Sequence, residues 1–593
     1  MTGGGLLTLV TYGTQNVILS GNPQMTYYFK LFKRYSHFSM ENVTIALDGP
    51  NTLTDTNPIQ LRAKIQRIGD LLSDMIFSFE LPDIYSNAVT AALGSSAGRA
   101  NEYNFQWVKA VGAAIINSAE FFIGGQSIQR IDGTYLYAKA QLEYDMATLN
   151  KWNIMVGNTP ELTTPQSGAY AANYTIGNNY PTVVPQPAAF TVTFTASSQS
   201  TTNTILNILV GSITGTIYTG MKFKYIGTDN KEYSNTIAGV IVAGSAYYLE
   251  TPATIPIQPI TVNVTPGVSR PSIYGQTIHV PLNFWFTDAT SQALPMIALQ
   301  NQECEVVLNL NPVQRLYTIL DPNGYRVAPN WKTQSNINNN PVYEAAAGTE
   351  NTTIQYFLAP TGTTGPLTWP GFNPRIQCTF VYLSDDERTT FATRPLTYVL
   401  PQLRVTPMSS SYEYPVNTVT EKLEFSSVIT RFIFVTRRTD WDRRNEFTNF
   451  TNWSTFPYAP WDPGALTGVL NYNASGLVVA NSQRDIIQGL RILCNGNEIQ
   501  EQKPYDFLTK VYPFRYTTGS ANAEIPIYTW ALTSSKIQPS GSINSSRVTN
   551  FQVEIAFNPL FPGANYGYNV DLYVETLNFL VIASGSGAPK YVL

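Results

Sequence analysis

The feature that most constrains the fold is a β-hairpin pattern that occurs twice, once in each half of the chain. Residues 115–129 read IINSAEFFIGGQSIQ and residues 486–500 read IIQGLRILCNGNEIQ, and the two segments align without a gap. The identical positions are Ile115, Ile116, Gly125, Ile128 and Gln129 in the first copy, and Ile486, Ile487, Gly496, Ile499 and Gln500 in the second. The central pairs, Gly124-Gly125 and Asn495-Gly496, both tolerate the positive φ of a tight hairpin. The repeat therefore predicts a duplicated β-domain with equivalent turns at these two pairs.

Strand-like segments account for almost every other strong local pattern. Runs such as DMIFSFELPD, ECEVVLNLNP and RFIFVTRR are β-branched, aromatic or alternating, and they end in turn residues. The 38 prolines and 40 glycines are spread through the 593 residues, so long helices have little room. Hydrophobic residues make up 43% and charged residues 13% of the chain, which excludes a disordered protein. The sequence predicts an all-β protein built from sandwiches or barrels.

Two segments between the hairpin copies differ in composition from the rest. Residues 187–265 belong to a Thr-, Ser- and Gly-rich stretch that still contains strand-like runs such as FTVTFTA and GMKFKYIG, so we expect a small β subdomain inserted in the first half. Residues 313–374 are rich in Asn, Pro and Gly and are predicted to connect the halves. The resulting division is a leader (1–26), a first domain (27–312), the connecting region (313–374) and a second domain (375–593).

The chain contains few of the residues that usually form metal sites or catalytic triads. Cys304, Cys378 and Cys494 lie far apart and lack a paired spacing, and His37 and His279 are the only histidines. These numbers argue against a zinc site and against a histidine-based triad. We expect no catalytic residue, no metal and no cofactor, and we expect the cysteines to be small buried side chains in a protein that folds without disulfides.

The stretch QMTYYFKLFKRYSHFS, residues 24–39, places aromatic rings among basic side chains, as in proteins that bind single-stranded nucleic acids. However, the whole chain has 36 Lys and Arg against 40 Asp and Glu, a net charge of −4, whereas nucleic-acid binders usually have a basic excess. We interpret the stretch as the entry to a strand and expect no direct contact with nucleic acid. No signal peptide or membrane-spanning segment is predicted either.

A long loop, TDWDRRNEFTNFTNWSTFPYAPWDPG (439–464), combines tryptophans with Arg, Asn and Asp. Two interpretations remain open. Flat indoles beside amide and carboxylate groups suit the face of a sugar, whereas aromatic residues and Arg are also enriched where subunits meet. We favour the subunit contact, and the candidate interface residues are Trp441, Arg443, Arg444, Trp453 and Trp461.

Several blocks of the sequence, in order, carry a family resemblance. They are MTGGGLLTLVTYGTQNVILSGNPQMTYYFKLFKRYSHFSMENV (1–43), HVPLNFWFTDATSQALPMIALQNQECEV (279–306), FVYLSDDERTTFA (380–392), IYTWALTSSKIQPSGSINSSRV (527–548) and LNFLVIASGSGAPKY (577–591). The chain resembles the major capsid proteins of nucleocytoplasmic large DNA viruses, whose N-terminal pattern has Asp, Thr and Arg where this chain has Asn16, Ser20 and Lys33. The blocks span nearly the whole chain.

The resemblance implies two tandem jelly-roll β-barrels, with the insertion in the first, and a homotrimeric pseudo-hexagonal capsomer that tiles an icosahedral shell over an inner membrane. Residues 24–39 would then enter the first strand, with Tyr28 and Phe29 in the core and Lys30, Lys33 and Arg34 at its polar side or at a subunit contact. The expected partners are further copies of the chain, neighbouring capsomers, and minor capsid proteins beneath the shell on the membrane side, which the leader would contact. The insertion at 187–265 is expected to face outward, toward the host surface or glycans.

The expected role is therefore structural, in the virion, with assembly in the host cytoplasm. Two alternatives stay open: a lectin-like β-sandwich that binds carbohydrate through the tryptophan loop, and a minor capsid paralogue. A carbohydrate-active enzyme would need a convergent pair of carboxylates, which the sequence does not show.

Overall fold

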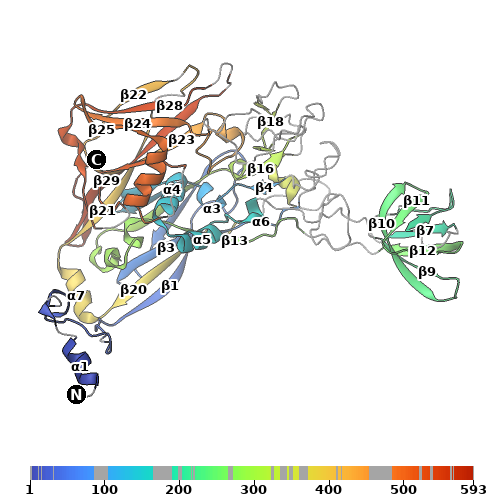
Figure 1. Ribbon diagram of the computed structural model, residues 1–593, viewed down its shortest axis with the longest axis horizontal. Coiled ribbons are helices and arrows are strands. Elements are labelled where there is room, and N and C mark those ends of the chain that lie inside the picture. Colours follow the sequence, from blue (N-terminus) through green and yellow to red (C-terminus); the bar gives the residue numbers. More distant parts are fainter. Residues whose placement is uncertain are drawn as a thin grey trace.

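The chain is described here by a computed structural model. It describes residues 3–10, 13–14, 17–30, 32–85, 105–163, 190–197, 204–215, 217, 221–264, 271–321, 326–333, 343–345, 352–358, 371–408, 412–415, 417–452, 484–519, 524–534, 538–560, 564 and 566–591. Strands dominate, as the sequence predicts, and they form two jelly rolls with a separate group of strands at the right of Figure 1. No helix within the described ranges is long and apolar enough to cross a membrane.

The first jelly roll consists of two sheets that face each other. One has the order β1 (Phe38–Ala46), β20 (Arg375–Leu383), β3 (Leu71–Glu80), β13 (Thr277–Pro281), and β14 (Leu294–Pro295) also pairs with β3. The other has the order β2 (Ile59–Ile65), β15 (Cys304–Leu310), β5 (Ile116–Ile123), β6 (Gln126–Ile131). All these pairs are antiparallel.

The second jelly roll repeats this arrangement. Its sheets have the orders β21 (Leu396–Pro407), β29 (Tyr568–Ala583), β23 (Val428–Arg438), β26 (Ile527–Thr529), and β22 (Thr418–Leu423), β28 (Phe551–Phe557), β24 (Ile487–Cys494), β25 (Asn497–Pro504). Strand β27 (Ile543–Asn544) pairs with β23 as β14 pairs with β3, and β30 (Ser586–Pro589) extends from β29. Apart from β30, each of these strands of the second roll thus has a counterpart at the same position in the two sheets of the first.

Alternation of apolar and polar residues explains why these strands form a sandwich. In β2, Ile59, Leu61, Ala63 and Ile65 are buried while the residues between them are exposed, so the strand presents one apolar face. Most buried apolar side chains of both rolls belong to one continuous cluster, which includes Phe77 and Phe121 in the first roll and Phe434 in the second. The two rolls therefore share a core.

Strand pairing moves the predicted boundary between the halves. Residues 375–383, assigned from the sequence to the second domain, form β20, which pairs with β1 and β3 of the first roll. The predicted connecting region, 313–374, accordingly lies between β15 and β20 in chain order, and so between two strands of the first roll. Within it, β16 (Tyr317–Leu320) pairs with β17 (Arg326–Val327) and with β4 (Gln106–Trp107), and β18 (Trp331–Thr333) pairs with β19 (Tyr343–Ala345).

The inserted segment forms its own small β subdomain. One sheet has the order β8 (Ile205–Asn207), β11 (Ala246–Leu249), β10 (Glu232–Val242), β9 (Lys222–Ile226), and β7 (Phe190–Ala196) pairs with β12 (Gln258–Val264). Its buried apolar residues, among them Phe194, Phe223 and Ile260, form a core separate from that of the rolls. In chain order it lies between β6 and β13, two strands of the first roll.

Short helices fill the links between strands. Those after β4 and β6 are α3 (Val111–Ala114), α4 (Gly133–Glu143), α5 (Met146–Met155) and α6 (Pro160–Thr163). The link after β25 contains η9 (Phe507–Val511), a π-helical turn, followed by α8 (Tyr512–Tyr516). The chain passes from the first roll to the second through α7 (Asp385–Thr393).

The N-terminal segment differs from its prediction. Helices α1 (Gly3–Val10) and α2 (Val17–Ser20) lie beside the lower edge of the first roll in Figure 1, and the first strand begins only at Phe38. Tyr28 is 100% exposed and Phe29 is also exposed, so the prediction that they contribute to the core is wrong for the single chain. Among the strands that the structure describes, none pairs with the segment before β1, so no sheet covers these rings.

Candidate functional site: the junction between the two jelly rolls

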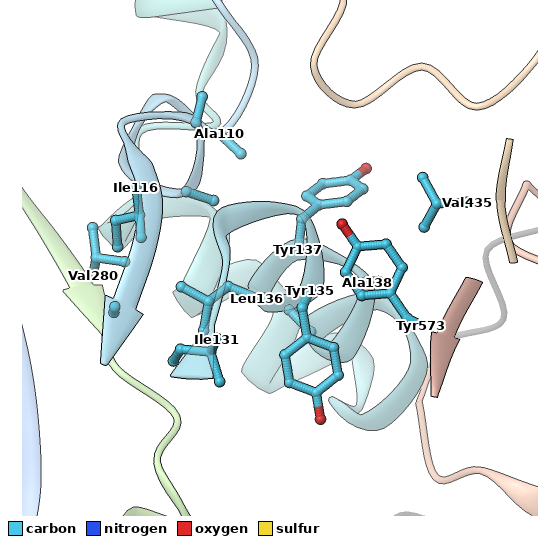
Figure 2. Packing of buried hydrophobic residues seen from close by; sticks show 14 of the residues in the cluster. Ala110, Ile116, Ile131, Tyr135, Leu136, Tyr137, Ala138, Val280, Val435 and Tyr573 are labelled. Carbon is cyan, nitrogen blue, oxygen red and sulfur yellow. The ribbon is translucent and has the colours of Figure 1, made fainter. Parts of the chain in front are cut away.

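The candidate site is the surface along which the two rolls meet, and helix α4 occupies its centre. Asp132 begins the helix, because its side chain accepts a hydrogen bond from the Tyr135 backbone N–H at 2.7 Å. Figure 2 shows Leu136 on the side of Ile131 of the first roll and Tyr137 on the side of Tyr573 and Val435 of the second, while the Tyr135 ring points away from these residues. Residues 133–142 are all buried, which is expected of a helix held between two sheets rather than on one.

A buried network of charges joins α4 to the second roll. The guanidinium of Arg431, on β23, is fully buried and donates to both carboxylate oxygens of Glu575 on β29, at 2.8 and 2.5 Å. It also donates to Glu143 Oε1 of α4 at 2.8 Å. Tyr135 completes the contact by donating its hydroxyl to Glu575 at 2.9 Å. The forked pairing fixes the relative position of the helix and the two strands.

The second cation of the network is Lys139, which lies one turn before Glu143 on α4. Its ammonium donates to both oxygens of Asp288, at 2.9 and 3.0 Å. Burial acts to lower the pKa of Lys139, but Asp288 and Glu143 outweigh it, so the pKa lies well above the usual value and the side chain stays charged. Burial raises the pKa of Glu143, and Lys139 and Arg431 offset only part of that rise. The network is a fixed set of mutually compensating charges.

A cavity of about 430 Å³ opens beside this network. Its lining includes Gln129 and Lys139 from the first roll and Pro401, Ser534 and Glu575 from the second. Two hydrogen bonds link the rolls here: Gln129 donates to the Pro401 carbonyl at the cavity, and Gln402 donates to the carbonyl of the neighbouring Ile128, both at 3.0 Å. The arrangement can hold two sheets in register, and we see in it no nucleophile activated by a neighbouring base.

The hairpin turns singled out in the sequence lie at matching places. Gly124 and Gly125 link β5 to β6 with φ of 58° and 80°, and Asn495 and Gly496 link β24 to β25 with φ of 50° and 81°. In each turn the first residue donates its N–H to the carbonyl just before the neighbouring strand, Gly124 to Glu303 at 2.8 Å and Asn495 to Asn550 at 2.7 Å. Both hairpins also have a register shift at the same place, after Phe121 and after Ile492.

The predicted interface loop is only partly available to a partner. Trp441 is half-buried, with the Arg437 guanidinium 4.5 Å from its ring centre, and Arg443 lies 4.9 Å from the ring centre of Trp331. Arg444 is 3% exposed and pairs with Asp440 and Glu446 at 3.4 and 3.0 Å, so it supports the loop from inside and cannot meet another subunit. Trp453 and Trp461 lie outside the described residues.

Reactive groups elsewhere are few among the described residues. Burial raises the pKa of the Cys304 and Cys378 thiols to about 12, so they are protonated and inert at neutral pH, and all three cysteines are free. No cluster of three His, Cys, Asp or Glu side chains suited to a metal ion occurs in the parts of the chain that the structure describes.

Comparison of this chain with known proteins identifies its family. A family profile described as "Major capsid protein N-terminus" matches residues 26–171 and 267–357, and one described as "Large eukaryotic DNA virus major capsid protein" matches residues 387–588. The first match is interrupted over the insertion, and the second begins within α7. The chain belongs to the major capsid proteins of large eukaryotic DNA viruses.

Relatives agree with this assignment over the full length. The major capsid protein of Phaeocystis pouchetii virus is 21% identical, and that of Paramecium bursaria Chlorella virus 1 is also 21% identical, each aligned over 99% of both chains. The major capsid protein of Chrysochromulina ericina virus is 32% identical over 29% of this chain and 31% of its own.

Solved structures share the fold. A chain of the PBCV-1 virus capsid has a TM-score of 0.55 at 16% identity, covering 96% of this chain and 100% of its own, and the Faustovirus major capsid protein has a TM-score of 0.52 at 10% identity, covering 96% and 94%. The capsid protein described here is thus a double jelly roll, a structural component of the virion that associates with itself in a shell, and not an enzyme.

The junction was not predicted from the sequence. The available signal was Arg431, a charged residue between the apolar residues of VIT (428–430) and FIFV (432–435), since charged side chains are almost never fully buried unless they are paired. Its partner Glu143 lies 288 residues earlier, and nothing local connects the two.

Proposed function

We propose that this capsid protein forms a homotrimeric capsomer with a pseudo-hexagonal outline, which tiles the facets of an icosahedral shell. The observation that carries this proposal is the matching strand order of the two rolls, joined by a buried and charge-paired junction. Two similar barrels held rigidly side by side in each chain would give a trimer six similar barrels, one at each corner of a pseudo-hexagonal outline. Closed rings of identical chains are common symmetric assemblies.

Light scattering tests the trimer directly. We expect a solution mass three times that of the 65.6 kDa chain. A protein that is folded by circular dichroism but stays monomeric at high concentration would contradict the trimer. The number of copies of this chain in each particle, measured by quantitative mass spectrometry, tells whether the chain is the main capsid protein or a minor capsid paralogue.

We also propose that the leader faces the interior of the particle, toward minor capsid proteins and the inner membrane. The supporting observation is a row of exposed apolar side chains before and at the start of β1, namely Leu6, Leu7, Val10, Val17, Ile18, Met25, Tyr27, Tyr28, Phe29, Phe32, Tyr35 and Phe38. So many exposed apolar groups indicate a surface that a partner covers. All three cysteines are free, so no disulfide of this chain requires an oxidising compartment, and we place assembly in the host cytoplasm.

The insertion is proposed to stand on the outer face and to meet the host surface or glycans. Its separate core supports this role, because a subdomain that shares no core with the rolls can project without disturbing them. A glycan array with the intact protein, compared with a variant in which a Gly/Ser bridge replaces residues 187–265, tests it. Glycan binding that survives the excision would point instead to the loop around Trp441, the carbohydrate-binding alternative. No direct role in nucleic-acid binding is proposed.

A further inference from the structure

The internal repeat makes it possible to ask what the second roll does with the elements that the first roll uses at the junction. Counting without a gap from Gln129 and its counterpart Gln500, Tyr135 corresponds to Asp506, Lys139 to Lys510 and Glu143 to Phe514. The segment Asp506–Phe514, which spans η9 and the start of α8, is therefore the counterpart of α4. Both follow the second strand of the repeated hairpin.

The two helical segments differ in one respect, which is what covers them. Tyr135, Lys139 and Glu143 are the α4 residues that form the charge network at the junction; Tyr135 and Lys139 are buried, and the side chain of Glu143 is only 13% accessible. Their counterparts are exposed: the side chains of Asp506 and Lys510 are 70% and 59% accessible, and Phe514 is 87% exposed. In contrast, Ala138 and Leu142 correspond to Thr509 and Pro513, and all four are buried. The helix face that the second roll covers on α4 is therefore exposed to solvent on the corresponding segment, Asp506–Phe514.

On the second roll, α4 packs against the face of β23 and β29 that carries Arg431 and Glu575. We call the equivalent face of the first roll the receiving face, and the register shifts of the strands locate it. In the second roll, a register shift at Thr430 separates the pairs Ile429↔Thr576 and Arg431↔Glu575. In the first roll, a register shift at Ser73 separates Leu72↔Phe380 and Asp74↔Thr379. Aligning the two shifts makes Asp74 the counterpart of Arg431 and Thr379 the counterpart of Glu575. The neighbouring residues agree, since Ile76 and Phe77 then match Ile433 and Phe434.

This receiving face is also incompletely covered. Ile433 and Arg431 are fully buried beneath the first roll, whereas Ile76 and Asp74 are only half-buried. Burial raises the pKa of Asp74, and no cation of the described residues forms an ion pair with its carboxylate. The charges are complementary, because two cations flank Phe514 on the helical segment while the Asp74 carboxylate lies at the receiving position: Arg515, and Lys510, which also pairs with Asp506 at 2.9 Å.

We propose that the exposed face of η9 and α8, formed by Lys510, Val511, Phe514 and Arg515, docks on the face of β3 and β20 around Asp74, Ile76 and Thr379 of a second copy of this chain. The contact repeats the junction within the chain, with Phe514 against Ile76. The cation is now on the helical segment and the carboxylate, Asp74, is on the sheet, whereas within the chain Glu143 lies on the helix and Arg431 on the sheet. It is a head-to-tail contact, which closes into a ring when the rotation between copies allows it. The inference rests on the self-association proposed above and assigns the surfaces that carry it.

The first experiment compares Phe514→Glu with Ile257→Glu, a control in which an exposed apolar side chain of the insertion receives the same charge. We expect the concentration needed for half-maximal trimer formation to rise at least about tenfold for Phe514→Glu, because a large apolar side chain at the centre of a contact is replaced by a charge. Ile257→Glu should match the wild type. Trimers that withstand Phe514→Glu, or that are lost equally in the control, would overturn the assignment.

A mixing experiment tests the head-to-tail geometry. Phe514→Glu retains the β3 and β20 face, and Asp74→Lys retains the helical face, so each alone should be monomeric while their mixture should form a heterodimer of twice the chain mass. Thr379→Arg serves as a second variant of the receiving face should Asp74→Lys fail to fold by circular dichroism. Mixtures that stay monomeric would overturn this geometry. A wild-type protein that never trimerises would refute the proposed capsomer itself, whereas a wild-type trimer unaffected by these variants would refute only the surfaces named here.

Discussion

Arg431 is a charge with no exposure to water, and its stability depends on two carboxylates from different parts of the chain. Replacing it by Met keeps much of its volume but leaves Glu143 and Glu575 buried without their shared cation. We expect Arg431→Met to lower the free energy of unfolding by about 3–5 kcal/mol, measured by urea denaturation. Arg62→Met, which removes an exposed pair with Glu305, is the control and should cost less than about 1 kcal/mol. Equal effects of the two variants would contradict the role of the network.

Asp440 gives the second prediction at the scale of single residues. Burial alone would raise the pKa of Asp440, but Arg438 and Arg444 overcome it and lower the pKa from 3.8 to about 2. The ionised carboxylate therefore stabilises the folded state above about pH 4, and this stabilisation is lost as the pH falls toward 2. Asp440→Asn should be less stable than the wild type by at least about 2 kcal/mol at pH 6. The difference in unfolding free energy between the wild type and Asp440→Asn should become smaller between pH 4 and pH 2 in urea titrations. A difference that does not change with pH would contradict the role of the ionised carboxylate.

At the scale of elements, the repeated hairpins offer a matched pair of sites. A side chain added at Gly125 or Gly496 would meet nothing within 4 Å, so only the positive φ opposes substitution. We expect Gly125→Val and Gly496→Val each to cost about 1–2 kcal/mol of unfolding free energy, and Gly496→Asn clearly less, because Asn adopts this conformation more readily. Thermal unfolding of the four proteins, wild type included, measures this. A large cost at one turn and none at the other would argue that the turns are not equivalent.

The inserted subdomain should unfold on its own, because its core is separate from that of the rolls. Phe194 is buried between its sheets, and its ring lies edge-on to Phe223 with 5.8 Å between ring centres. In Phe194→Ala we expect the insertion to lose about 3–5 kcal/mol. Calorimetry should then show a small transition at lower temperature while the main transition is unchanged. Phe434→Ala, in the shared core, is the control that should shift the main transition instead.

What the sequence could predict depended on how local the determining interactions are. The hairpins, their turn residues and the insertion were predictable because a few adjacent residues specify strands and tight turns. The place of β20 was not, since its partner strand β3 lies about 300 residues earlier and only pairing assigns it to the first roll. Helix α4 was missed for another reason: it is buried on all sides and so lacks the amphipathic pattern that reveals a surface helix.

At the scale of the whole molecule, the exposed apolar leader is separable from the rolls that form the tile. Because residues 3–10 and 17–20 lie outside both sheets of the first roll, we expect a variant that lacks residues 1–20 still to form trimers, with a solution mass three times that of the shortened chain. The same deletion should reduce the yield of closed particles in electron micrographs, as shell contacts on the inner side are lost. Replacing the deleted residues by a Gly/Ser segment of equal length is the control for length alone. Normal particles from the deletion variant would rule out this role for the leader.

The separate core of the insertion also bears on how such a protein changes over time. A substitution inside β7 to β12 alters contacts only with the subdomain itself, whereas a substitution in β3 or β23 alters packing in the shared core of both rolls. With the proposed position of the insertion on the outer face, selection by a changing host can act on it at little cost to the packing of the rolls, and we expect natural variation among close relatives to concentrate there. For the same reason, we expect that a foreign domain can replace residues 187–265 without disturbing the shared core of the rolls, and the proposed outer position would then display it in many ordered copies on the particle.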